Sequence, residues 1–249
     1  MKKSFTKIDL EEIFRKIGGM LPRSVEVFLL GGGAMCFRNQ KNATKDLDLV
    51  FKNREEFKEF ANAITALGFV EPKRVENAYE EMKAAGIWEG RNGFRLDLFV
   101  SKVCGALSLS QDMAARSELL GNYGKLAVKM VSNEDVILFK GITERLDDAD
   151  DIAAIIRSAA INWDIIVKEC AAQSKARAWY GPLYNKLTEI QEKHGMTIPV
   201  TKQLQKLDKR AALREAYERR TGQGLTPAQA ISELAKLGFK KKEIENAIK

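Results

Sequence analysis

The sequence predicts an α+β fold, in which a small mixed β-sheet with flanking helices spans residues 1–160 and an all-helical part spans residues 161–249. Short apolar runs alternate with amphipathic segments as far as residue 160. No later segment has the alternation of a strand. The first part holds 24 basic and 24 acidic side chains and the second holds 17 and 10, so the net charge of +7 falls entirely on the second.

Composition narrows the class of protein further. With 249 residues, 45% of them hydrophobic, the chain is long enough to bury a core without disulfides. Cys36, Cys104 and Cys170 stand far apart and His194 is the only histidine, so a zinc site, a histidine-based triad and a disulfide framework are poorly supported. With no signal peptide and no apolar run near 18 residues, we expect a cytoplasmic protein without membrane contact.

Local patterns define the elements of the first part. Apolar residues at helical spacing predict an amphipathic helix over residues 7–18. Residues 24–30 form an apolar run that ends at three glycines, which predicts a buried strand. The other predicted elements are a helix beginning at 34–38, a strand over 47–51, helices over 54–67 and 77–85, a hairpin of 87–88 with 94–100 around Asn92-Gly93, an edge strand over 124–130 and a helix over 133–145.

Only helices are predicted after residue 147. They cover residues 147–158, 162–193 with a break near Gly181-Pro182, and 201–220. Residues 226–249 predict a small module of two short helices. The excess positive charge of residues 161–249 favours contact with phosphate, on a nucleic acid or a nucleotide, although lysines on solvated helix faces would give the same count.

Three consecutive glycines, Gly31 to Gly33, follow the first predicted strand. Without side chains the backbone can approach an anion closely, and a helix beginning at Ala34 would add its unpaired N–H groups and its dipole. The spacing matches neither the dinucleotide-binding nor the P-loop pattern. The glycines therefore indicate a phosphate site only together with a second feature.

Asp46 and Asp48 supply that feature. They lie two residues apart on a predicted strand and so share one face, while their apolar neighbours face the other way. A bound Mg²⁺ would explain two adjacent carboxylates, and an exposed strand end with two solvated aspartates is the alternative. Asp97, on the alternating strand of the hairpin, adds a third carboxylate. Three aspartates on neighbouring strands can hold two divalent cations that clamp a triphosphate.

Together these motifs resemble the signature of the DNA polymerase β-like nucleotidyltransferase superfamily, a glycine pair followed by an Asp-x-Asp flanked by apolar residues. The small prokaryotic branch that includes abortive-infection-type nucleotidyltransferases is the most similar. The matching residues are Leu30-Gly31-Gly32-Gly33-Ala34, Thr44-Lys45-Asp46-Leu47-Asp48-Leu49 and Leu96-Asp97-Leu98. Two positions depart from the pattern: many relatives have Gly-Ser in place of Gly-Gly, and Asn42 stands where an arginine is usual.

The resemblance implies a Mg²⁺-dependent enzyme that moves NMP from an NTP to a hydroxyl and releases pyrophosphate. The implied catalytic residues and ligands of two Mg²⁺ ions are Asp46, Asp48 and Asp97, and the implied nucleotide-binding residues are Gly32, Gly33, Lys45 and Lys140. Similar families also carry a later motif of a lysine, an arginine and an Asp-x-x-Asp. Lys140, Arg145, Asp148 and Asp151 match this motif, although an ordinary charged helix face would match it too.

The partner of the reaction stays open at this point. The acceptor would be RNA, for example a tRNA end, or a protein or small molecule, and the resemblance also suggests a cognate partner protein of the toxin–antitoxin kind. The alternative is a catalytically silent protein that keeps the nucleotidyltransferase scaffold and binds nucleic acid or a partner protein through its basic helices.

Overall fold

The computed structural model describes residues 4–72, 84–143, 145 and 147–248. The chain packs as two compact units, Met1–Asn162 and Trp163–Lys249. The division of the sequence at residue 160 into two domains stays a prediction. Among the residues that the structure describes, none of the helices is both long and apolar enough to cross a bilayer.

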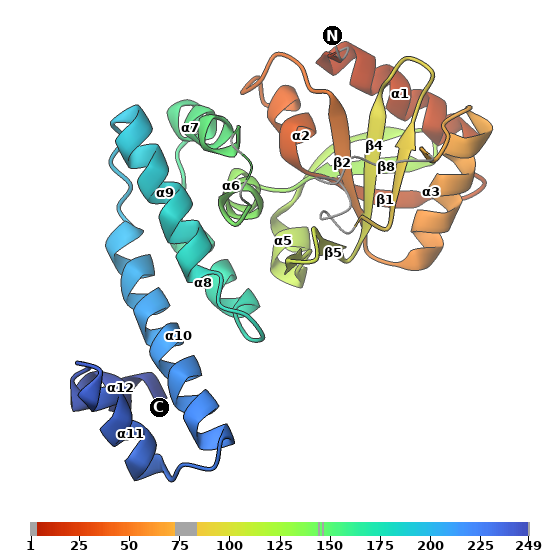
Figure 1. Cartoon of the computed structure of the whole chain (residues 1–249). Coiled ribbons are helices and arrows are strands. Elements are labelled where there is room, and N and C mark those ends of the chain that lie inside the picture. The colour runs from red at the N-terminus through yellow and green to blue at the C-terminus, as the bar shows by residue number, and fades with distance from the viewer. Residues whose placement is uncertain (1–3, 73–83, 144, 146, 249) are drawn as a thin grey trace. The chain divides into compact units, whose positions relative to one another are not determined.

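A mixed β-sheet forms the centre of the first unit (Figure 1). Its strands run in the order β6-β5-β4-β2-β1-β8-β7, with β3 beside β4. The pairs β1–β8 and β2–β4 are parallel, and the other pairs are antiparallel. The strands are β1 (Val25–Leu29), β2 (Asp46–Phe51), β3 (Gly86–Glu89), β4 (Arg95–Val100), β5 (Lys102–Val103), β6 (Leu107–Ser108), β7 (Glu118–Tyr123) and β8 (Leu126–Met130).

Helices pack against this sheet. The described helices of the unit are α1 (Lys7–Met20), α2 (Gly31–Phe37), α3 (Arg54–Ala66), α5 (Gln111–Arg116), α6 (Asn133–Gly141) and α7 (Asp148–Ser158). α3 packs on β1, β2 and β4 beside α1, whereas α2 packs on β2 and α6. Leu47 and Leu49 of β2 are fully buried. The alternating residues of the same strand are Asp46 and Asp48, so β2 places one face in the core and carboxylates on the other.

The α+β prediction is confirmed, and several predicted elements need correction. The strand over 124–130 is not at an edge, because β8 lies between β1 and β7, and β7 was not predicted. The glycines do not precede a helix that begins at Ala34: α2 begins at Gly31 itself. The helix over 133–145 ends at Gly141. The helix expected at 77–85 falls almost wholly on residues 73–83, outside the described part of the chain.

All regular secondary structure in the described residues of the second unit is helical. The helices are α8 (Trp163–Gln173), α9 (Tyr180–His194), α10 (Thr201–Gly222), α11 (Pro227–Lys236) and α12 (Lys241–Ile248). The break predicted at Gly181-Pro182 lies earlier, over residues 174–179, because proline fits the first turn of a helix and does not interrupt α9. The two predicted short helices are present, and Leu213 of α10 packs with Leu234 and Ile244.

Candidate active site

Strands β2 and β4 bring the three predicted aspartates to one face of the sheet. They are parallel neighbours in which Asp46 lies opposite Arg95, and Asp48 lies opposite Asp97. Directly opposed residues on paired strands point to the same side, and so do residues two apart on one strand. Asp97 is fully buried, whereas Asp46 and Asp48 are partly exposed. The register therefore places the three aspartates on one face of two neighbouring strands, and their roles as ligands and catalytic residues stay predictions.

The glycines at the start of α2 make room for neighbouring side chains. A methyl group on Gly31, which has a φ of +54°, would lie 2.2 Å from Oδ2 of Asp48. A methyl on Gly32 would lie 2.6 Å from Oγ1 of Thr44. Gly33 is packed in the same way against the core leucines of β1 and β2. The chain thus needs glycine here so that the carboxylate of Asp48 can lie directly against the first turn of α2.

Arg95 binds two of the three carboxylates. Its Nη2 donates to Oδ2 of Asp46 at 2.6 Å and to Oδ2 of Asp97 at 2.9 Å. Its Nε lies 2.8 Å from Oδ1 of Asp97. The guanidinium therefore bridges the two strands through Nη2, whereas Nε and Oδ1 of Asp97 form an ion pair without a hydrogen bond between them. The side chain of Arg95 is 15% exposed, so these contacts form where water screens them little.

The electrostatics of this face are unbalanced. Burial, followed by repulsion from Asp46 and Asp97, raises the pKa of Asp48 to about 7. Burial likewise raises the pKa of Asp97 to about 6, with repulsion from Asp46 adding to it and the charge of Arg95 opposing it. Removing a carboxylate from water disfavours its ionised form, and a neighbouring like charge does the same. The face therefore carries more negative charge than its own cations neutralise.

Two residues from other loops lie close to the aspartates. Arg145, in the connection between α6 and α7, interacts electrostatically with Asp48 and Asp46, which raise the pKa of the guanidinium against the effect of burial. Cys104, in the turn between β5 and β6, has a thiol whose pKa burial and Asp48 raise to about 12. A raised pKa favours the protonated thiol at neutral pH. Arg145 adds positive charge beside Asp48.

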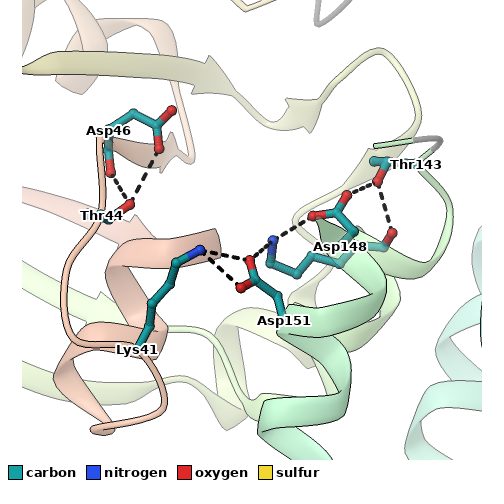
Figure 2. A network of polar contacts seen from close by, with 7 residues as sticks. Lys41, Thr44, Asp46, Thr143, Asp148 and Asp151 are labelled. Carbon is teal, nitrogen blue, oxygen red and sulfur yellow. Dashed lines mark hydrogen bonds and ion pairs between the residues drawn. The ribbon is translucent and has the colours of Figure 1, made fainter. Parts of the chain in front are cut away.

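Lys140 belongs to a second group of charges, drawn in part in Figure 2. Its Nζ lies 2.6 Å from Oδ1 of Asp148 and 2.8 Å from Oδ2 of Asp151. Asp151 also accepts from Nζ of Lys41 at 3.0 and 3.1 Å, and Thr143 donates to Asp148. We call Lys41, Lys140, Thr143, Asp148 and Asp151 the lysine–aspartate network. The ammonium group of Lys140, which was expected to contact a phosphate, is thus paired with two carboxylates.

The lysine–aspartate network differs from the helix face expected from the sequence. Lys140 lies on α6 and the two aspartates lie on α7, so the network joins two helices. Burial lowers the pKa of Lys140, but the two carboxylates outweigh it and the pKa ends above its ordinary value. Burial raises the pKa of Asp151, and the two lysines outweigh that in turn and lower it. The charges of Lys140 and Asp151 are thus each stabilised by their neighbours.

A family model described as "Nucleotidyltransferase of unknown function (DUF6036)" matches residues 8–191. The chain belongs to this family. Among solved structures, that of the lincosamide antibiotic adenylyltransferase LnuA with bound lincomycin is similar: the match covers 63% of this chain and 100% of that chain, at 16% identity and a TM-score of 0.43. The comparison with curated proteins finds no match.

The donor set of this nucleotidyltransferase fits a divalent cation. Mg²⁺ prefers hard oxygen ligands, which the carboxylates of Asp46, Asp48 and Asp97 supply on two adjacent strands. Their mutual repulsion is the imbalance that such a cation would relieve. Within the described residues, no three acidic, histidine or cysteine side chains converge as a metal-binding group. Coordination of one cation by all three aspartates would therefore require at least one of them to change its side-chain conformation.

One further predicted nucleotide-binding residue, Lys45, lies beside the start of β2. Lys45 is exposed immediately before β2, next to Asp46. Thr44 donates from its hydroxyl to the backbone oxygen of Asp46 at 3.1 Å and so fixes the start of the strand (Figure 2).

Arg95 was not identified from the sequence, although it stands two residues before Asp97 on an alternating strand and strand periodicity places it on the aspartate face. Lys41 and Cys104 carry no such signal, because only tertiary packing brings Lys41 to Asp151 and Cys104 close to Asp48.

Proposed function

We propose that this chain is a Mg²⁺-dependent nucleotidyltransferase that moves NMP from an NTP to a hydroxyl acceptor and releases pyrophosphate. The observation that carries the proposal is the register of β2 and β4, which sets Asp48 opposite Asp97 and Asp46 beside them on one face. The raised pKa values of Asp48 and Asp97 support it, since they indicate a face that an added cation would stabilise.

Asp46, Asp48 and Asp97 would hold the metal. When bound there, Mg²⁺ would offset negative charge on the triphosphate and lower the pKa of the acceptor hydroxyl. Asp97 is the deepest of the three, and we assign it a second role, in which it accepts the proton of the acceptor hydroxyl. Asp46, whose side chain is 28% exposed, would lie nearer the solvent side of the site.

The backbone of α2 and one lysine would contact the phosphates. The first residues of a helix have no intrahelical acceptor for their N–H groups, so those of Gly32 and Gly33 are suited to anions. Lys45 is exposed and can turn to a phosphate at little cost. Lys140 would first have to leave Asp148 and Asp151, so Lys45 is the stronger of the two proposed lysine contacts.

The acceptor is tested in the same experiment as the activity. The purified protein is incubated with Mg²⁺ and each α-³²P-labelled NTP, in separate arms with cellular RNA and with cellular protein. We expect label in one arm, its loss when EDTA is added, and its loss in Asp48→Asn. Asp112→Asn, which removes an exposed carboxylate of α5, is the matched control and should transfer label normally. Absence of transfer in both arms, with no binding of any NTP, would favour the catalytically silent scaffold.

A further inference from the structure

The guanidinium of Arg95 contacts two carboxylates and is largely buried. Arg95 is the first residue of β4 and pairs with a carboxylate on its own strand and one on the neighbouring strand. One partner, Asp97, is fully buried and would otherwise lie unpaired beside two other aspartates. A buried carboxylate that loses a directly paired cation is strongly destabilised, so Arg95 has a structural reason to stay in place.

The contacts of Arg95 restrict the orientation of two carboxylates, those of Asp97 and Asp46. Nη2 donates to Oδ2 of Asp97 and Nε lies 2.8 Å from Oδ1 as an ion pair, so the planar guanidinium contacts both oxygens and restricts the rotation of that carboxylate. The same Nη2 also reaches Asp46, which faces it across the strand pair. The orientation of Asp46 is thereby tied to that of Asp97.

We propose that Arg95 is a positioning residue of the reaction, which aligns Asp46 and Asp97 across the two strands so that both face a shared divalent cation. This inference rests on the proposed function. Side chains that orient metal ligands in this way usually contribute a factor of about 10 to 100 in metal affinity. Arg95 contacts the ligands and not the reacting atoms, so its effect should be seen in metal binding as well as in turnover.

The alternative that the structure poses is competition. Arg95 places a positive charge among the carboxylates that would bind the metal, and a cation that merely occupied the site would weaken metal binding. The two roles predict opposite signs for the same substitution. Removing Arg95 loosens the metal if it positions the ligands and tightens it if it competes.

The test is calorimetric titration of Mn²⁺ into the full chain with a non-hydrolysable NTP present. We expect Arg95→Gln to bind Mn²⁺ about tenfold more weakly than the wild type. Arg95→Lys should bind it about threefold more weakly, because lysine keeps the charge but lacks the planar guanidinium with its several N–H donors. Arg91→Gln, which removes an exposed arginine from the turn of the same hairpin, should bind as the wild type does. In transfer assays the apparent affinity for Mg²⁺ should follow the same order.

Equal or tighter Mn²⁺ binding by Arg95→Gln would overturn the proposal. If Arg95→Gln does not fold, Arg95→Lys decides it, and wild-type affinity in that variant overturns it. Binding that is unchanged in both Arg95 variants but lost in Asp48→Asn would leave the proposed function standing without this role for Arg95. An absence of Mn²⁺ binding to the wild type would overturn both.

Discussion

The aspartate face of β2 and β4 and the lysine–aspartate network of α6 and α7 are both groups of poorly exposed charges, and they are balanced differently. In the network two lysines meet two aspartates, and the charges of Lys140 and Asp151 are favoured, as the directions of their pKa shifts show. On the aspartate face Arg95 pairs with two of three carboxylates, and the pKa values of Asp48 and Asp97 rise. The charges of the lysine–aspartate network neutralise each other, whereas the aspartate face keeps an excess of negative charge.

This difference separates a structural role from a functional one. A buried group that is internally neutral contributes by joining the elements that carry it, here α6, α7 and the connection before β2. A group that keeps an excess of like charge is costly to the folded protein unless something else binds to it. Substitutions should therefore affect activity in one region and stability in the other.

The largest effect is expected at Asp48. Asp48→Asn removes a proposed metal ligand, and a bound metal is worth several kcal/mol in such reactions, so transfer should fall about 10³-fold. The same change relieves repulsion on the aspartate face, so the midpoint of thermal unfolding in EDTA should rise by about 2–4 °C. Radiolabel transfer and calorimetric melting measure the two quantities. A variant that lost activity together with stability would contradict the comparison.

Lys140 should show the opposite pattern. Lys140→Met leaves Asp148 and the α7 side of the network without their central cation, in a region where Asp148 is 5% exposed. Breaking a buried ion pair in this way costs about 3 kcal/mol, which urea unfolding would detect as a lower midpoint. Arg219→Met, which loses only an exposed pair with Glu215, is the control and should change stability little. An unchanged midpoint for Lys140→Met would show that the network does not stabilise the unit.

The pH dependence of stability should also differ between the two regions. Because the pKa values of Asp48 and Asp97 are raised to about 7 and about 6, the folded protein binds protons more tightly than the unfolded chain. The free energy of unfolding in EDTA should therefore fall as pH rises from about 4 to about 7. Asp151 has a lowered pKa, so its stabilisation is complete above pH ~4 and lost only in acid.

Urea unfolding at pH 5, 6, 7 and 8 would measure this dependence. Asp48→Asn should flatten the decline, whereas Asp151→Asn should lower stability by the same amount at each of these pH values. A wild-type protein whose stability rises over this range would show that the aspartate face is not strained.

The smallest effect is expected at Lys41. Its side chain is 36% exposed and it shares Asp151 with Lys140, so Asp151 keeps one cation when Lys41 is removed. Lys41→Met should lower the free energy of unfolding by about 0.5 kcal/mol. A loss as large as that of Lys140→Met would mean that the connection before β2 depends on this anchor more than its exposure suggests.

Strand periodicity predicted which residues of each strand share a side, whereas the register that sets Asp48 opposite Asp97 came from the structure. Residues two apart share a side of a strand, so Asp46 with Asp48 could be paired from the sequence, and Arg95 with Asp97 could have been. The network could not be predicted, because it depends on where α6 ends and α7 begins. Lys140 and Asp151 were placed on separate predicted helices, over 133–145 and 147–158, and helix bounds alone do not show that α6 and α7 bring the two side chains together.

The central claim is that Asp46, Asp48 and Asp97 together bind a divalent cation that holds the nucleotide. Crystals grown or soaked with Mn²⁺ and a non-hydrolysable NTP would test it through the anomalous signal of the metal. We predict an anomalous peak within bonding distance of carboxylate oxygens from all three aspartates and of the triphosphate. A bound nucleotide with its metal elsewhere, or with no metal peak beside the three aspartates, would contradict it.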